Sequence, residues 1–294
     1  MHVLLAGSSG FLGTHLSERL RHDGHRVTPL VRRAPQAGQR RWDPYAGPLD
    51  PATLEDVDVV VNLAGSPTLG NPHSEKWAHG LERSRVTTTR VLADAIAASD
   101  RKPAFLAGNG ISFYGDHGDQ RLDETADSRG AALLTRVTRR WQAATTPASD
   151  AGARVAVIRT APVLDAASAP LKQLRMLFST GLGGRLGSGR QYFPVVSLRD
   201  WVGGVAHLVT SEVGGPVNLC APQVPTNGEF TAALGAALHR PTLAPVPAIA
   251  IRAAAGPMAP EVLNSVRGVP QALLDDGYTF ADRDISAILA TALA

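Results

Sequence analysis

The stretch Val3-Leu4-Leu5-Ala6-Gly7-Ser8-Ser9-Gly10-Phe11-Leu12-Gly13 decides the fold of this chain. A short apolar run, typical of a strand, passes into three glycines spaced Gly-x-x-Gly-x-x-Gly, and a helical pattern follows at 11–21. Glycine at these three places allows a tight turn, a close approach of the backbone to a ligand and close packing of helix on strand. The stretch therefore predicts a strand, a tight turn and a helix in immediate succession.

The same alternation of strand and helix patterns continues along the first half of the chain. Strands are predicted at 2–6, 26–31, 40–43, 58–63, 104–108, 155–159 and 216–220, and helices at 11–21, 74–99, 131–149, 198–211, 228–238, 249–256 and 284–293. Several strands are almost continuously Val, Leu or Ile, as buried parallel strands are. The pattern predicts an α/β protein with a doubly wound parallel Rossmann sheet and a smaller C-terminal lobe.

In that fold, the glycine turn is a phosphate site, because the helix start offers free N–H groups and the positive end of the helix dipole. We therefore expect a dinucleotide there, held by the turn residues Gly7, Ser8, Ser9, Gly10, Phe11, Leu12 and Gly13. The strand at 58–63 ends in Asn62-Leu63-Ala64-Gly65, whose small residues let the adenine-ribose side of a cofactor pass closely.

The predicted strand at 26–31 is followed by Arg32 and Arg33, where a protein that prefers NAD usually has an acidic residue. An arginine there can form a charge-assisted fork to a 2′-phosphate, so the sequence favours NADP(H). The alternative is a solvated pair of surface arginines.

The composition limits the classes of protein to which the chain can belong. It has 294 residues, 44% of them hydrophobic and 19% charged, which is enough for a large core. The pI is near 9.3, but the net charge is only +3 and aromatic residues make up 5%, so no nucleic-acid surface is expected. No run is long enough to span a membrane, and the lone Cys220 permits no internal disulfide, so a cytoplasmic protein is predicted. The scattered histidines His73, His117, His207 and His239 predict no metal site.

These motifs together resemble the extended short-chain dehydrogenase/reductase superfamily, and within it the NAD(P)-dependent epimerase/dehydratase branch of "epimerase family" proteins called nucleoside-diphosphate-sugar epimerases. Further stretches carry the resemblance: Ser84-Arg85-Val86, Phe113-Tyr114-Gly115-Asp116, Arg159-Thr160, 181–191, 215–219, 238–242 and 277–280. The resemblance implies a Rossmann domain at 1–164 and 198–221, a substrate-binding lobe at 165–197 and 222–294, and NADP(H) between them. It also implies that Arg85 and Arg159 bind the cofactor.

The usual catalytic pair of that superfamily is missing. Its members carry Tyr-x-x-x-Lys on the helix after the fourth long strand, where lysine lowers the pKa of the tyrosine. The helix predicted here contains neither residue, and Leu133 and Val137 stand where the pair is expected; the only lysines are Lys76, Lys102 and Lys172. The candidates that remain for catalysis are Tyr114, Asn109 and Ser112, with packing as the alternative role of Tyr114. Arg185 and Arg190 in the glycine-rich loop 181–190 are candidates for an anionic substrate, with a surface loop as the alternative.

These observations favour an NADP(H)-dependent oxidoreductase acting on a small molecule. Two alternatives remain: a non-catalytic module that senses the redox state of NADP(H), and an ordinary nucleotide-sugar epimerase. The oligomeric state is left open.

Overall fold

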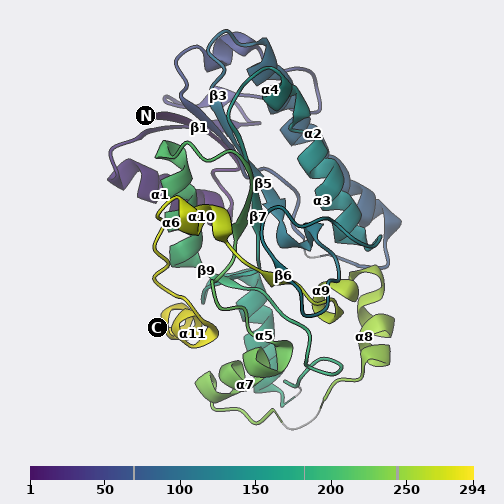
Figure 1. Cartoon of the computed structure of the whole chain (residues 1–294). Coiled ribbons are helices and arrows are strands. Elements are labelled where there is room, and N and C mark those ends of the chain that lie inside the picture. The colour runs from purple at the N-terminus through teal and green to yellow at the C-terminus, as the bar shows by residue number, and fades with distance from the viewer. Residues whose placement is uncertain (69, 182, 243–244) are drawn as a thin grey trace. The chain divides into compact units, whose positions relative to one another are not determined.

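The computed structural model describes residues 1–68, 70–181, 183–242 and 245–294 (Figure 1). Three residues of predicted segments lie outside the described residues: Leu182 of the glycine-rich loop, and Leu243 and Ala244 of the C-terminal lobe.

Seven strands form the central sheet. In spatial order they are β10 (Gly215–Leu219), β7 (Val155–Thr160), β5 (Ala104–Gly110), β4 (Val59–Asn62), β1 (His2–Ala6), β2 (Arg26–Val31) and β3 (Arg40–Arg41). The sheet is mostly parallel, with Val3 opposite both Val27 and Val59, and this confirms the predicted doubly wound fold. The order of the strands reverses between β1 and β4, and in such sheets ligands bind beyond the carboxyl ends of the strands at that point.

Five helices accompany these strands: α1 (Phe11–His22), α2 (Glu75–Ala98), α3 (Leu133–Ala143), α4 (Thr146–Asp150) and α6 (Leu198–Thr210). Ser74 begins α2 as its N-cap, with its side chain accepting a hydrogen bond from the Trp77 backbone N–H. The single helix predicted over 131–149 was wrong, because the chain breaks it into α3 and α4. Pro147 lies in the first turn of α4, where its missing N–H costs nothing.

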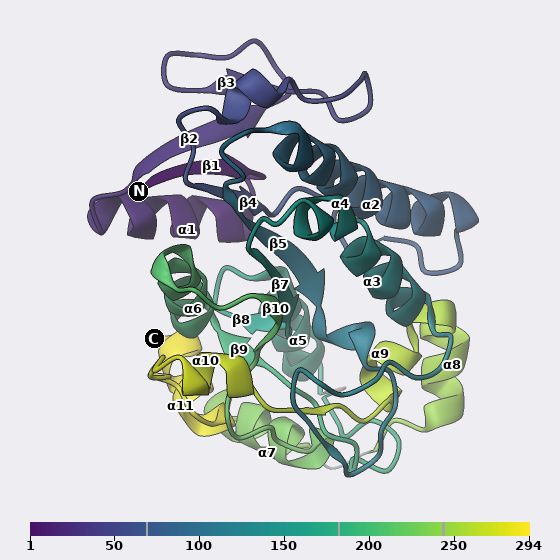
Figure 2. The ribbon, with the colours of Figure 1, turned by 45° about the horizontal axis from the view of Figure 1, so that its top comes forward.

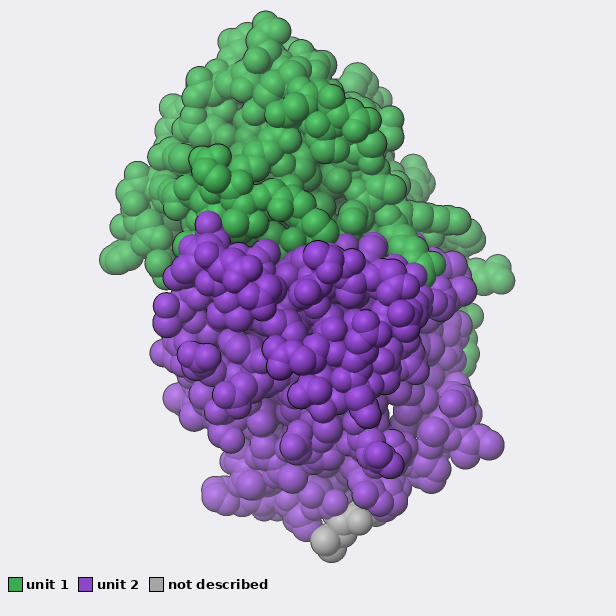
Figure 3. All heavy atoms as spheres, in the orientation of Figure 1, with its two compact units in different colours: residues 1–109, 137–158, 202–217 green, residues 110–136, 159–201, 218–294 purple. Residues whose placement is uncertain are grey.

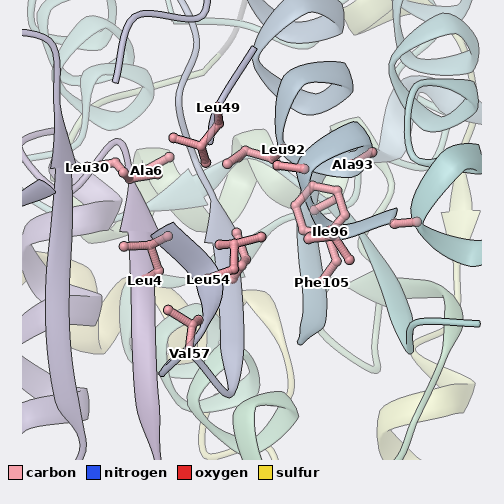
Figure 4. Packing of buried hydrophobic residues seen from close by; sticks show 14 of the residues in the cluster. Leu4, Ala6, Leu30, Leu49, Leu54, Val57, Leu92, Ala93, Ile96 and Phe105 are labelled. Atoms are coloured by element: carbon pink, nitrogen blue, oxygen red, sulfur yellow. The ribbon is translucent and has the colours of Figure 1, made fainter. Parts of the chain in front are cut away.

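The sheet and α2 enclose a hydrophobic core (Figure 4). Leu4 and Leu30 from neighbouring strands belong to one buried cluster with Leu92 and Ile96 of α2, and Phe105 of β5 belongs to the same cluster. Helix α4 packs beside α2 (Figure 2). Burying a side chain of this size contributes about 1.5–3 kcal/mol, so this core fixes the strand ends on which the candidate site is built.

The chain divides into two compact units, coloured separately in Figure 3. The first comprises 1–109, 137–158 and 202–217, and the second 110–136, 159–201 and 218–294. The second unit has its own core, in which Phe178, Phe230 and Leu289 are buried together. The division into a cofactor domain and a substrate lobe at 165–197 and 222–294 stays a prediction.

Short elements of the second unit join segments that are distant in sequence. The pairs are β6 (Arg121–Leu122) with β11 (Arg267–Gly268), and β8 (Val163–Leu164) with β9 (Val196–Ser197). Its helices are α5 (Ala169–Ser179), α7 (Asn227–Ala237), α8 (Ala248–Ala255), α9 (Pro260–Leu263), α10 (Gln271–Asp275) and α11 (Ile285–Leu293). Helix α5 was not predicted, although its N-cap Ser168 and the proline in its first turn are ordinary start signals. None of the helices within the described ranges combines the length and the hydropathy that crossing a bilayer needs.

Candidate cofactor site and proton-holding groups

The three glycines of the first turn are required for different reasons. Gly7 has a φ of +83°, and a Cβ there would lie 2.6 Å from the Leu63 carbonyl carbon. A Cβ on Gly13 would lie 2.2 Å from the Gly7 carbonyl oxygen. Gly10, in contrast, has an ordinary φ of −77°, and its Cβ would come no closer than 3.4 Å to another atom. Packing thus accounts for Gly7 and Gly13, whereas Gly10 keeps open a space on the outer side of the turn.

That space lies at the N-terminus of α1. No side chain caps this end of the helix, its first turn has no acidic residue, and Ser9 and Gly10 are exposed. The last turn carries Arg19, Arg21 and His22, which interact favourably with the negative end of the dipole. The geometry fits an anion such as a pyrophosphate, bound by the N–H groups of Phe11, Leu12 and Gly13.

Arg32 and Arg33 follow β2 at the same edge of the sheet. Because Ala6 pairs with Leu30, the end of β2 lies next to the glycine turn. Both arginines are exposed, and neither forms an ion pair with a described residue. By contrast, Arg26 and Arg40 at the other end of β2 and in β3 both bind Asp56. The strand end is therefore basic and has no acidic residue to bind a ribose.

The buried side chain of Asn62 forms hydrogen bonds that position the backbone after β4. Its buried side chain donates a 2.9 Å hydrogen bond to the Thr89 hydroxyl and accepts one of 3.0 Å from the Ala64 backbone N–H. These bonds hold Leu63, Ala64 and Gly65 in an irregular turn beside Gly7. Asn62 thus positions the backbone of this turn.

Arg85 of α2 lies half-buried beside that turn. Its guanidinium donates hydrogen bonds to the Leu81 carbonyl and the Thr68 hydroxyl, and it stacks on Trp141 with 5.2 Å to the ring centroid. Burial lowers the pKa of Arg85 to about 10, and no described carboxylate pairs with it. A cation placed in this way favours a bound anion.

Tyr114, Arg159 and Asn218 form a closed network in the second unit. Tyr114 is fully buried; its hydroxyl donates a 2.7 Å hydrogen bond to Asn218 Oδ1 and accepts one of 2.8 Å from Arg159 Nη1. The Arg159 guanidinium also lies 3.7 Å from the centroid of the Phe113 ring. Burial raises the pKa of Tyr114 to about 12, against the effect of Arg159. This arrangement favours the packing role of Tyr114.

Asn109 and Ser112 are both near the end of β5 but have different partners. Asn109 is buried and donates a 3.1 Å hydrogen bond to the Thr138 carbonyl. Ser112 donates one of 2.5 Å to Glu261, a residue that the sequence did not single out. A lone glutamate between Pro260 and Val262 carries no motif, and only the fold brings it to Ser112.

The remaining predicted residues are either buried aliphatic side chains or exposed arginines. Leu133 and Val137 are one turn apart on α3, and both are buried. Arg185 and Arg190 are exposed, and neither forms an ion pair with a described residue. Cys220 is fully buried, and burial raises the pKa of its thiol, which disfavours a role as a nucleophile. In the described part of the chain, no three His, Cys, Asp or Glu side chains gather as metal ligands.

Comparisons with known proteins agree with this architecture. The model of the NAD dependent epimerase/dehydratase family matches residues 3–135, and a second model, described as a domain of unknown function (DUF1731), matches residues 246–292. Epimerase family protein Mb2239 of Mycobacterium bovis is 41% identical over 98% of this chain and 96% of its own length.

The solved structures that cover the whole chain include two with more than 30% identity. The crystal structure of human epimerase family protein SDR39U1 (isoform 2) with NADPH has a TM-score of 0.88 and 31% identity, and 99% of it is covered. The nucleoside-diphosphate sugar epimerase from Corynebacterium glutamicum has a TM-score of 0.80 and 33% identity, with 58% of that chain covered. By its sequence relatives and its fold, the chain belongs to the NAD-dependent epimerase/dehydratase family, among the epimerase family proteins of the extended short-chain dehydrogenase/reductase type.

Proposed function

We propose that this protein binds NADP(H) at the carboxyl edge of its sheet and uses it as an oxidoreductase on a small molecule. The observation that carries the proposal is the glycine turn with an open Gly10, next to a strand end that bears Arg32 and Arg33. The structure of human SDR39U1 with NADPH, at 31% identity, supports the choice of cofactor.

Each part of the site has a distinct role in the proposal. The first turn of α1 binds the pyrophosphate through backbone N–H groups, and Arg32, with Arg33 beside it, binds the 2′-phosphate. Leu63, Ala64 and Gly65 leave room for the adenosine side. Arg85 supplies positive charge to the bound anion, whereas the buried Arg159 is engaged by the Tyr114 hydroxyl. When bound, NADPH supplies the hydride, and the protein orients the reactants and excludes water.

Titration of NADPH and NADH tests the cofactor assignment. A hydrogen bond to a charged group contributes about 1.5–3 kcal/mol, so we expect Arg32→Ala to weaken NADPH binding about ten- to a hundredfold and to leave NADH binding nearly unchanged. Arg21→Ala, an exposed arginine at the far end of α1, is the matched control. Equal losses for both cofactors would contradict the role of Arg32, and no affinity for either cofactor would overturn the proposal.

The alternative is a module that binds NADP(H) without turnover, and the buried Leu133 and Val137 in place of Tyr and Lys favour it. Absorbance of reduced nicotinamide, followed over a panel of carbonyl compounds, separates the two. Turnover supports the oxidoreductase, and tight binding without any change in absorbance supports the sensor. Interconversion of UDP-sugars at ordinary enzyme rates would instead identify an epimerase.

We infer a small molecule bound by the C-terminal lobe at 165–197 and 222–294, with Arg185 and Arg190 facing an anionic group. If so, Arg185→Ala and Arg190→Ala raise the KM of an anionic substrate and leave that of a neutral one unchanged.

A further inference from the structure

Glu261 has a carboxyl group in a mostly buried position. It lies in α9, within the segment matched by the domain of unknown function, and is partly exposed. The Ser112 hydroxyl donates a 2.5 Å hydrogen bond to its Oε2 atom, and it forms no ion pair with a described residue. Burial raises the pKa of Glu261 to about 7, while the bond from Ser112 acts in the opposite direction. A carboxyl in this setting exchanges a proton near neutral pH.

Ser112 and Glu261 are 149 positions apart in the sequence. Hydrogen bonds between the neighbouring residues of the two segments hold them together. Ser265 Oγ donates to the Gly118 carbonyl at 2.5 Å, and the His117 backbone N–H donates to the Ser265 carbonyl at 3.1 Å. Strands β6 and β11 then pair immediately beyond. The segment that contains Glu261 is thus hydrogen-bonded to the segment that contains Ser112.

Other titratable side chains of these segments are engaged elsewhere. Asp116 accepts hydrogen bonds from the backbone N–H groups of Ser265 and Gly118, His117 Nε2 bonds with the Tyr114 carbonyl, and Arg267 stacks on Tyr192. None of the three shifts the pKa of Glu261, whose causes are burial and Ser112 alone. The pKa of Glu261 therefore depends on its burial and on Ser112, and not on these three side chains.

We propose that Glu261, with Ser112 bonded to it, is the group that gives a proton to the substrate and takes it back, in place of the missing tyrosine and lysine. This inference rests on the proposed oxidoreductase function. Ser112 follows the last residue of β5 by two positions, so chain connectivity keeps it within about 7 Å of that strand's carboxyl end, the edge at which Rossmann proteins bind their ligands.

In the reducing direction the carbonyl carbon accepts the hydride, the carbonyl oxygen accepts the proton of the Glu261 carboxyl, directly or through the Ser112 hydroxyl, and the products are an alcohol and oxidised cofactor. Glu261 is left as a carboxylate and regains its proton from solvent. In the oxidising direction the carboxylate takes the proton of the alcohol.

A titration of the carboxyl itself tests the inference without any turnover. In protein labelled with ¹³C at the glutamate carboxyl, we expect one resonance, absent from Glu261→Gln, to titrate near pH 7. In Ser112→Ala the same resonance titrates at a higher pH, because the hydroxyl that lowers the pKa is gone. Titration in the ordinary range of glutamate, or no shift in Ser112→Ala, overturns the inference.

Kinetics with NADPH and phenanthrenequinone as a carbonyl probe complete the test. We expect Glu261→Gln to lower kcat roughly a hundredfold with the KM for NADPH unchanged, and Glu261→Asp to recover part of the loss. Glu212→Gln makes the same chemical change at an exposed glutamate and is the matched control. Wild-type kcat falls as the pH rises through the pKa of Glu261, and this fall moves upward in Ser112→Ala.

The failures are distinguishable. If Glu261→Gln keeps the wild-type kcat and pH profile, the inference is wrong and the oxidoreductase stands. If NADPH binds but neither the quinone nor a panel of carbonyl compounds is reduced, the oxidoreductase and the role of Glu261 are both contradicted. If NADPH does not bind, the cofactor assignment fails first.

Discussion

Gly10 and Gly13 of the glycine turn differ in the space that a Cβ atom would find. Gly13 has no room for a Cβ because the Gly7 carbonyl oxygen would be 2.2 Å away, whereas Gly10 has room for one. The sequence predicts all three glycines as a motif, but only the backbone geometry shows that they are not equivalent.

We therefore expect Gly13→Ala to lower the free energy of unfolding by about 1–3 kcal/mol, the usual cost of overpacking. Gly10→Ala should unfold like the wild type and yet lose NADPH affinity, because its methyl group points into the space proposed for the pyrophosphate. Denaturant unfolding and NADPH titration of both variants check this. A Gly10→Ala variant that binds NADPH normally would place the pyrophosphate elsewhere.

Tyr114 gives a second prediction at this scale. Tyr114→Phe removes the buried hydroxyl that accepts a hydrogen bond from Arg159 and donates one to Asn218, which costs about 1–3 kcal/mol of stability. In the folded variant we expect the kcat of any NADPH-dependent reaction to stay within a few-fold of wild type. Loss of turnover at full stability would instead restore Tyr114 as the proton donor.

Among the elements, strands were the most predictable. The predicted strands 2–6 and 26–31 agree with β1 and β2 to the residue. The helix at 131–149 was less predictable, since the break before Pro147 depends on how α4 packs beside α2. The pair of Glu261 and Ser112 could not be predicted at all, because each residue is unremarkable in its own segment.

Asp56 forms ion pairs with Arg26 of β2 and Arg40 of β3 at the edge of the sheet. These ion pairs predict that stability depends on pH. Hydrogen bonds from Arg40 above all, and from Arg26, lower the pKa of Asp56 to about 2, below the ordinary value of an aspartate. A carboxylate with a lowered pKa stabilises the fold above its unfolded pKa, and this contribution is lost as the pH falls through the folded value. Asp56 is 47% exposed, so the contribution is below about 1 kcal/mol.

Unfolding of wild type and Asp56→Asn at pH 7 and at pH 2 measures this contribution. We expect the difference in unfolding free energy to be present at pH 7 and to shrink toward zero near pH 2. A difference that does not depend on pH would show that the carboxylate charge is not its source.

The whole molecule consists of two compact units, and only the first contains the glycine turn. A ligand that binds only the native state stabilises it by about 2.7 kcal/mol when its concentration is a hundred times Kd. In calorimetry we expect NADPH to raise the unfolding temperature more than NADH does at equal concentration. If two unfolding transitions are resolved, we expect NADPH to raise the temperature of one of them in the wild type. In Arg32→Ala the same transition should shift less when NADPH is added.

The contact between Glu261 and Ser112 also has a consequence for biosynthesis. Translation delivers the glycine turn and most of the sheet long before α9 leaves the ribosome, and domains usually fold in the order of their synthesis. A nascent chain can thus form the glycine turn proposed to bind the dinucleotide before Glu261, the proposed acid–base group, has been made. Under the role proposed for Glu261, reduction of a carbonyl compound then waits for the segment that carries α9.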